Sequence, residues 1–153
     1  MTDPALLAPD FWTVHCDGSA VPNPGRMGFG VVVTDPAGQR HAFSQATHAI
    51  GCNNEAELRA LMAAFEALKS RGVTKFCAYS DNSVLVAQLS DAGSQPIARL
   101  ATLFDEARAL LSSFEQASVR WIPRHRNVEA DALARAAMGL PPKPLAKPSK
   151  RKR

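Results

Sequence analysis

The segment FWTVHCDGSAVPNPGRMGFGVVVTDPAGQRHAFSQATHA, residues 11–49, decides the fold. It contains three stretches of residues that favour β-strands, at 11–18, 28–35 and 40–49. Between them lie VPNPG (21–25) and DPAGQ (35–39), in which Pro, Gly and Asn favour turns. Turns this short join antiparallel strands, because parallel strands need a long crossover. The segment therefore predicts a three-stranded antiparallel meander.

The spacing of apolar residues changes after this meander. Residues 53–71 have apolar side chains at helical intervals, with Asn53 or Asn54 as a cap and Glu55 and Glu57 in the first turn. Further strands are predicted at 75–80 and 118–122, further helices at 83–89, 97–114 and 128–138, and a loop at 91–96. This order predicts an α/β fold, a mixed five-stranded sheet of three antiparallel strands and then two parallel strands, flanked by helices.

The length and composition fit a single folded domain. The chain has 153 residues, of which 46% are hydrophobic, enough for one core. We expect residues 1–10 to form a flexible leader and residues 11–140 to form the domain. Residues 141–153, PPKPLAKPSKRKR, contain six cations and no acid, which predicts a disordered basic tail. The net charge of +4 becomes −2 without these cations, so the tail either binds nucleic-acid phosphates or serves only solubility.

Other features bear on the location of the protein. No apolar run approaches the length of a membrane helix, and the first ten residues do not resemble a signal peptide. The three cysteines, Cys16, Cys52 and Cys77, are odd in number and form no CxxC pair, which argues against a disulfide framework or a structural zinc site. We expect a cytoplasmic monomer with no membrane partner.

Four acidic residues lie at the ends of predicted elements. Asp17 closes the first strand and Asp81 follows the fourth, and these strands would be parallel neighbours with adjacent carboxyl ends. Glu57 and Asp131 lie in the first turns of two helices. Clustered carboxylates raise one another's pKa unless a cation offsets the charge, and oxygen ligands suit Mg²⁺ or Mn²⁺. Taken singly, each acid could instead start a turn or complement a helix dipole.

Four motifs give these acids a common context: DGSAVPNPG (17–25), GCNNEAEL (51–58), YSDNSVLV (79–86) and RWIPRHRNVEADALARAAM (120–138). Together they resemble the type 1 ribonuclease H family, in its compact form without the basic protrusion, over residues 11–140. The resemblance implies an endonuclease that hydrolyses the RNA strand of an RNA–DNA hybrid and leaves 5′-phosphate and 3′-hydroxyl ends. It also implies two Mg²⁺ ions, with Mn²⁺ as a possible substitute.

The resemblance assigns a role to each acid. Asp17 would bridge both ions, Glu57 and Asp81 would help to hold the ion at the leaving oxygen, and Asp131 would help to hold the ion with the attacking water. Helical phase hardly separates Glu55 from Glu57, and the family pattern selects the acid directly before Leu58.

Several residues resemble, or lie beside, positions that contact the hybrid. The expected substrate-binding residues are Asn23, Asn53, Asn54, Asn82, Arg124, Arg126 and Asn127. Asparagine both donates and accepts hydrogen bonds, which suits 2′-hydroxyl groups and minor-groove edges. The alternatives are helix capping for Asn53, Asn54 and Asn127, a turn for Asn82, and a solvated loop for the two arginines.

The chain also departs from the family pattern. Many members carry a basic insertion where this chain has only LSDAGSQPIA (89–98), so the hybrid must be held elsewhere, and the tail is a candidate. His125, in the short loop 123–127, either assists catalysis or is a surface histidine. Cys52 replaces a hydroxyl residue that often helps to hold a DNA phosphate. Trp12 and Trp121 are expected in the core.

Two other functions compete with this hypothesis. One is another nuclease of the superfamily, such as a resolvase or an integrase-like enzyme, but those lack a helix start of the NNEAEL type. The other is a non-catalytic module that binds hybrid or RNA. The loss of one carboxylate would favour that module, and all four are present.

Overall fold

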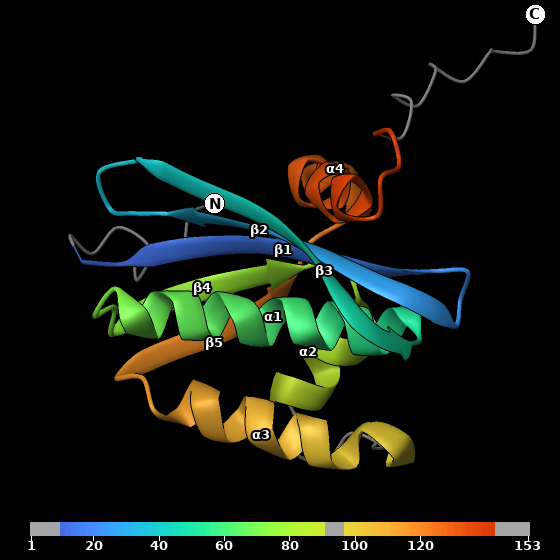
Figure 1. Ribbon diagram of the computed structural model, residues 1–153. Coiled ribbons are helices and arrows are strands. Elements are labelled where there is room, and N and C mark those ends of the chain that lie inside the picture. Colours follow the sequence, from blue (N-terminus) through green and yellow to red (C-terminus); the bar gives the residue numbers. More distant parts are fainter. Residues whose placement is uncertain (1–9, 91–96, 143–153) are drawn as a thin grey trace, which may run out of the picture.

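A single mixed sheet organises the molecule, which a computed structural model describes for residues 10–90 and 97–142. The strand order is β3–β2–β1–β4–β5, and Figure 1 shows the sheet with helices on both faces. The strands are β1 (Trp12–Val21), β2 (Gly25–Thr34), β3 (Arg40–Gly51), β4 (Lys75–Ser80) and β5 (Gln116–Trp121). The first three pair antiparallel, whereas β4 pairs parallel with both β1 and β5. The predicted fold class is confirmed.

The helices divide unequally between the two faces of the sheet. They are α1 (Asn53–Ser70), α2 (Ser83–Ser90), α3 (Ala101–Ser112) and α4 (Val128–Ala137), with short 3-10 turns η2 (Ala98–Leu100) and η3 (Arg124–Arg126). In Figure 1, α4 covers one face, while α1, α2 and α3 lie on the other. The helix expected over 97–114 starts as η2 and ends earlier, at Ser112. The expected loop at 91–96 and most of the leader and tail lie outside the described residues.

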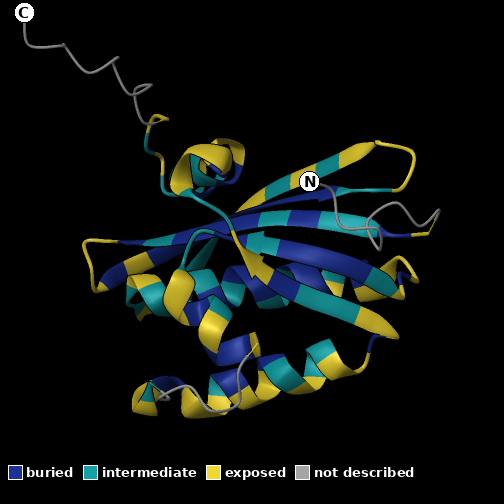
Figure 2. Ribbon diagram, turned by 180° about the vertical axis from the view of Figure 1, so that it is seen from behind, coloured by how far each residue is buried: buried dark blue, intermediate teal, exposed yellow. Residues whose placement is uncertain are grey.

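The main core lies between the sheet and α1. Leu58, Leu61, Phe65 and Leu68 recur at intervals of three or four residues and are fully buried. The ring of Phe65 lies 5.5 Å from that of Phe76 in β4, centroid to centroid. Burying one such side chain stabilises the fold by about 1.5–3 kcal/mol. Figure 2 shows buried residues along the central strands and exposed ones on the outer sides of the helices.

Two glycines allow helices to approach the sheet closely. A Cβ on Gly18 would lie 2.4 Å from the carbonyl carbon of Ala56 in α1. A Cβ on Gly30 would lie 2.6 Å from the carbonyl oxygen of Ala130 in α4. Gly30 pairs with Asp17 across β1 and β2. The missing side chains therefore bring α1 and α4 to the part of the sheet that contains Asp17.

The two tryptophans differ in burial. Trp12 packs against the core, as expected. The expectation for Trp121 is wrong, since this side chain is 52% exposed and its indole N–H donates to the Asp81 carbonyl at 3.2 Å. Trp121 is the last residue of the edge strand β5, in which Val119 alone is buried.

The described helices contain no membrane-span candidate. None in residues 10–90 and 97–142 combines the length and the apolar character that crossing a bilayer requires.

Candidate active site

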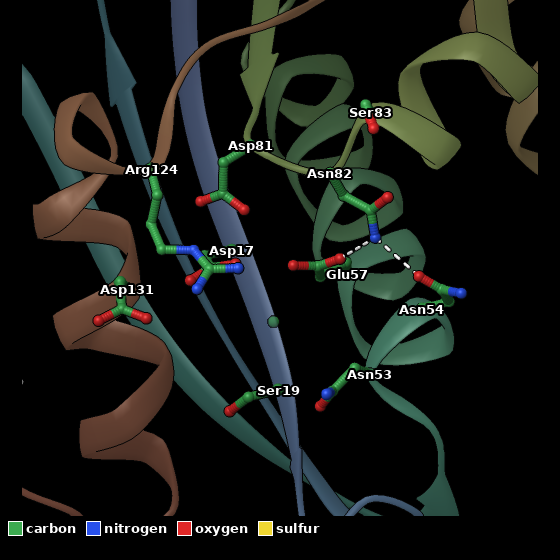
Figure 3. Close-up of a pocket in the computed structure, with 11 residues that line it drawn as sticks. Asp17, Ser19, Asn53, Asn54, Glu57, Asp81, Asn82, Ser83, Arg124 and Asp131 are labelled. Carbon is green, nitrogen blue, oxygen red and sulfur yellow. Dashed lines mark hydrogen bonds between the residues drawn. The ribbon is translucent and has the colours of Figure 1, made fainter.

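The four acids line one cavity of about 410 Å³ at the end of the central strands (Figure 3). Asp17 lies in β1 and Asp81 directly follows β4. The last paired residues of β1 and β4 are His15 and Tyr79, so the two strands part just before the acids. Parallel strands that separate at their carboxyl ends leave a crevice, which explains why both carboxylates reach the same space.

The acids form a group of three with a fourth across the cavity. One carboxylate oxygen from each of Asp17, Glu57 and Asp81 lies within 4.8 Å of the others. Glu57 belongs to the second turn of α1 and not to the first, because the cap is Cys52 and the helix already begins at Asn53. Asp131 lies in the first turn of α4, as expected, and shares a side-chain hydrogen bond with Asp17. Glu55 instead pairs with Arg59 at 2.8 Å.

Burial and mutual repulsion raise the pKa values of the clustered acids. Burial, followed by the charges of Asp81 and Glu57, raises the pKa of Asp17 to about 10. Burial also raises the pKa of Glu57, although hydrogen bonds from Asn82 and Asp17 act in the opposite direction. The pKa of the buried Cys16 thiol is raised by burial first and then by the charges of the three acids. A cluster of this kind favours a bound cation.

The donor set fits a hard divalent cation. Three carboxylates offer oxygens within one ion's reach of each other, and Asp17 faces a fourth acid. Oxygen-only ligation of this kind suits Mg²⁺ or Mn²⁺ rather than a soft metal. Deprotonation of Asp17, which its own environment resists, becomes favourable once a cation compensates the charge.

Arg124 is the cation of the cavity lining. It extends from η3 towards the acids in Figure 3, and its charge lowers the pKa of Glu57. Arg124 is an exposed residue. Its position places a positive charge beside the carboxylates.

Asn23 and Asn53 join the turn after β1 to the start of α1. The Oδ1 of Asn53 accepts from the Ala20 N–H at 2.8 Å, and the Oδ1 of Asn23 accepts from the Asn53 N–H at 3.0 Å. The helix cap is therefore neither Asn53 nor Asn54, and that expectation is wrong. The cap is Cys52, whose Sγ accepts from the Glu55 N–H at 3.4 Å.

Asn127 differs from the expected substrate contact. It is 1% exposed, and its Nδ2 donates to the Cys16 carbonyl and to Asp81 Oδ2, both at 2.9 Å. It occupies the cap position of α4 without a side-chain capping bond. We therefore correct its role. A side chain that is buried and bonded to Asp81 holds one of the acids in place and does not face a duplex.

Two other expected residues lie outside the acid cavity. Arg126 lines a separate space of about 180 Å³ together with His15 and Arg40, which pairs with Glu129. His125 lies on the exposed side of η3 and lines none of the described cavities.

Other residues at the site were not anticipated from the sequence. Ser19 lines the acid cavity, and its buried hydroxyl has no hydrogen-bond partner among the described residues. Arg99 lies in a neighbouring cavity of about 650 Å³ with Asn23, Cys52 and Asn54, and its Nη2 donates to Cys52 Sγ at 2.9 Å. Ser19 is part of the DGS motif, but Arg99 follows a stretch without family motifs, so no local pattern could have indicated it.

Comparisons with known proteins agree with this architecture. A family model described as "Reverse transcriptase-like" matches residues 15–137. The sheet order together with the acid cluster defines a ribonuclease H-like domain.

Two relatives indicate which ribonuclease H family the chain belongs to. Ribonuclease HI of Halobacterium salinarum is 34% identical over 137 residues, which are 88% of this chain and 69% of the relative. The bifunctional protein Rv2228c of Mycobacterium tuberculosis is 35% identical over 127 residues, 82% of this chain. The match spans only 35% of that longer mycobacterial protein.

Solved structures resemble most of this chain. Ribonuclease H1 of Halobacterium salinarum superposes with a TM-score of 0.79 at 30% identity, covering 84% of this chain and 98% of that one. The N-terminal ribonuclease H domain of Rv2228c gives 0.77 at 32% identity, with 85% and 94% covered. LC11-RNase H1, solved with an RNA/DNA hybrid, gives 0.76 at 28% identity, with 84% and 96% covered. The chain belongs to the type 1 ribonuclease H family.

Proposed function

We propose that this protein is an endonuclease that hydrolyses the RNA strand of RNA–DNA hybrids. The observation that carries the proposal is the convergence of four acids, from four separate segments of the chain, on one cavity. A relative named ribonuclease HI and a related structure in complex with a hybrid support the same activity and substrate.

The four carboxylates would hold two divalent ions, for which we propose Mg²⁺, with Mn²⁺ as a substitute. Asp17 is central to the cluster and would be shared, Glu57 and Asp81 would hold the ion at the leaving oxygen, and Asp131 would hold the ion at the water side. When bound, two such ions supply an activated water and offset the charge on the leaving oxygen in phosphodiester hydrolysis, which gives 5′-phosphate and 3′-hydroxyl ends.

Residues on the rim would orient the hybrid. Asn53 and Asn54 line the acid cavity at the start of α1, where amide groups can distinguish a 2′-hydroxyl from deoxyribose. Arg124 would contact a phosphate beside the acids, since its guanidinium is a charged, planar donor. Asn23 and Arg126 would act farther along the duplex, beyond the acid cavity.

The cavity beside α1 would hold a phosphate of the DNA strand. Its lining combines Cys52, at the N-terminus of an 18-residue helix, with the cation Arg99. A helix N-terminus and a guanidinium both attract phosphate. Arg99 would thus compensate for the hydroxyl that Cys52 does not provide.

Replacing Arg99 tests this phosphate contact. We expect Arg99→Gln to weaken hybrid binding in EDTA and to make the slope of log affinity against log salt less steep by about 1. Arg71→Gln, at the opposite end of α1, is the control and should leave the slope unchanged. Equal slopes for wild type and Arg99→Gln would exclude the contact.

The activity itself is tested with a labelled RNA–DNA hybrid in Mg²⁺, in Mn²⁺ and in EDTA. We expect cleavage of the RNA strand alone in either metal and none in EDTA. Asp81→Asn should bind the hybrid without cutting it. Binding without cleavage by the wild type in every metal would support a non-catalytic binding module instead.

Replacing His125 tests whether this residue takes part in catalysis. We expect His125→Ala to cleave at nearly the wild-type rate, since the side chain lies outside the acid cavity. Loss of a general acid or base typically costs about 10²-fold or more. A drop of that size in single-turnover rate, with binding unchanged, would assign His125 to proton transfer.

Three expectations remain predictions. They are the cytoplasmic location, the monomeric state and a clamping role for the basic tail. Residues 143–153 of that tail lie outside the described part of the chain. Removing residues 141–153 and repeating the salt titration would test the last of these.

A further inference from the structure

Asn82 lies between Asp81 and α2, and its side-chain oxygen is committed to that helix. Its Oδ1 accepts from the Val84 N–H at 3.0 Å and from the Leu85 N–H at 3.1 Å. These bonds satisfy two of the backbone donors that every helix start leaves unpaired. The oxygen of the amide therefore points to α2.

The nitrogen of the same amide is committed to α1. Asn82 Nδ2 donates to Asn54 Oδ1 at 2.7 Å and also to Glu57 Oε2 (Figure 3). Asn54 and Glu57 are three residues apart, so they lie on the same face of α1 and one amide can reach both. Each of its two N–H groups has an acceptor.

The chemistry of the neighbours fixes which way the amide lies. If it were turned over, its oxygen would face the Glu57 carboxylate and its N–H groups would face the N–H groups of α2. Both arrangements repel, so hydrogen bonding assigns one orientation. With the backbone N–H donating to Ser80 and the carbonyl accepting from Val86, all polar groups of Asn82 are used within the protein.

We propose that Asn82 is a positioning residue that holds Glu57 and Asn54 in fixed relation to the loop carrying Asp81. The inference rests on the proposed function and deepens it, because a positioning role for Asn82 replaces the direct contact with the hybrid that the sequence predicted. Glu57 has a long side chain with several rotatable bonds, and a fixed donor limits its freedom. The amide thereby couples Glu57, a proposed metal ligand, to Asn54, a proposed contact of the hybrid.

One substitution separates this role from capping. In Asn82→Ser, the hydroxyl can still accept from the first turn of α2, but it is too short to reach α1. This variant should melt close to the wild type in EDTA, which would show that the fold is retained.

The deciding readout is Mg²⁺ binding to the full chain, measured by titration calorimetry without substrate. Loss of a bond that orients a metal ligand typically weakens metal binding by about 10- to 100-fold. We expect a loss of this order for Asn82→Ser. Unchanged Mg²⁺ affinity in Asn82→Ser would overturn the proposal and leave Asn82 as a cap of α2 alone.

Hybrid binding in EDTA gives the second readout. If Asn82 acts through Asn54, the losses caused by Asn82→Ser and Asn54→Ala should not add in the double variant. Fully additive losses would overturn the coupling and favour a direct contact of Asn82 with the hybrid. Failure of the wild type to cleave would count against the proposed function alone, since neither readout depends on cleavage.

Discussion

Asp17→Asn should abolish hybrid cleavage and, at the same time, stabilise the metal-free protein. The amide cannot replace a carboxylate shared by two ions, so we expect the rate to fall by about 10³-fold or more. The same amide removes a buried charge site from the cluster of Asp81 and Glu57. Activity and stability should therefore change in opposite directions.

The pH dependence of that stabilisation follows from the pKa of Asp17. Its ordinary value is 3.8, and the fold raises it to about 10, so the folded state retains a proton that the unfolded chain releases. The penalty is absent below pH 3.8, grows as the pH rises and is complete near pH 10. The gain from Asp17→Asn should grow over the same range.

Thermal unfolding in EDTA measures this gain. At pH 8 the raised pKa sets an upper limit of about 6 kcal/mol on this gain, and a gain of about 2 kcal/mol is equivalent to a rise of about 4–8 °C in Tm. Mg²⁺ should then stabilise the wild type more than the variant. Asp105→Asn is the control, because Asp105 is an exposed acid on α3, 80% accessible, and should change neither quantity. A gain from Asp17→Asn that did not depend on pH would contradict the assignment of the raised pKa.

Gly30→Ala should cost both stability and activity, because α4 packs directly on this glycine. The new Cβ would meet the Leu133 Cβ at 2.4 Å and the Ala130 carbonyl oxygen at 2.6 Å, and neither atom is the end of a flexible chain. Overpacking of this kind costs about 1–3 kcal/mol. Displacement of α4 also moves Asp131, and a misplacement of about 1 Å can cost about 10²-fold in rate.

Gly28 provides a matched control two residues earlier in β2. There a Cβ would mainly meet the side chain of Met138, at 2.8 Å, and a methionine can move aside. We expect Gly28→Ala to change the free energy of unfolding by less than about 1 kcal/mol. Urea unfolding and single-turnover cleavage of both variants would measure the difference. Equal effects would mean that the approach of α4 does not position Asp131.

Local sequence determined the elements and the acids. Strand and helix signals depend on neighbouring residues, so the elements could be predicted from them, and the order of the elements indicated the parallel β1–β4 pairing. The four acids could be identified as candidates because strand ends and helix starts are themselves local features. Gly72 ended α1 near its predicted boundary, which is also a local signal.

Only the tertiary structure decided what the amides and the cap do. Asn53 looked like a cap, but its Oδ1 bonds β1, so Cys52 caps α1 instead. Asn127 looked accessible before α4, yet it lies beneath Asp81. Their partners are distant in sequence, and a hydrogen bond between distant segments leaves no periodic pattern in either one.

The same distinction applies to charge and exposure. The sequence predicted Trp121 in the core, but its strand lies at the edge of the sheet and its side chain is exposed. Arg99 reaches Cys52 only because η2 lies beside the start of α1. The sequence by itself determined which residues could perform the chemistry, because local patterns select strands, helices and their ends. The packing of α1 and α4 against Gly18 and Gly30 decided which of these residues come together in the site. That arrangement depends on contacts between distant segments, which no local pattern encodes.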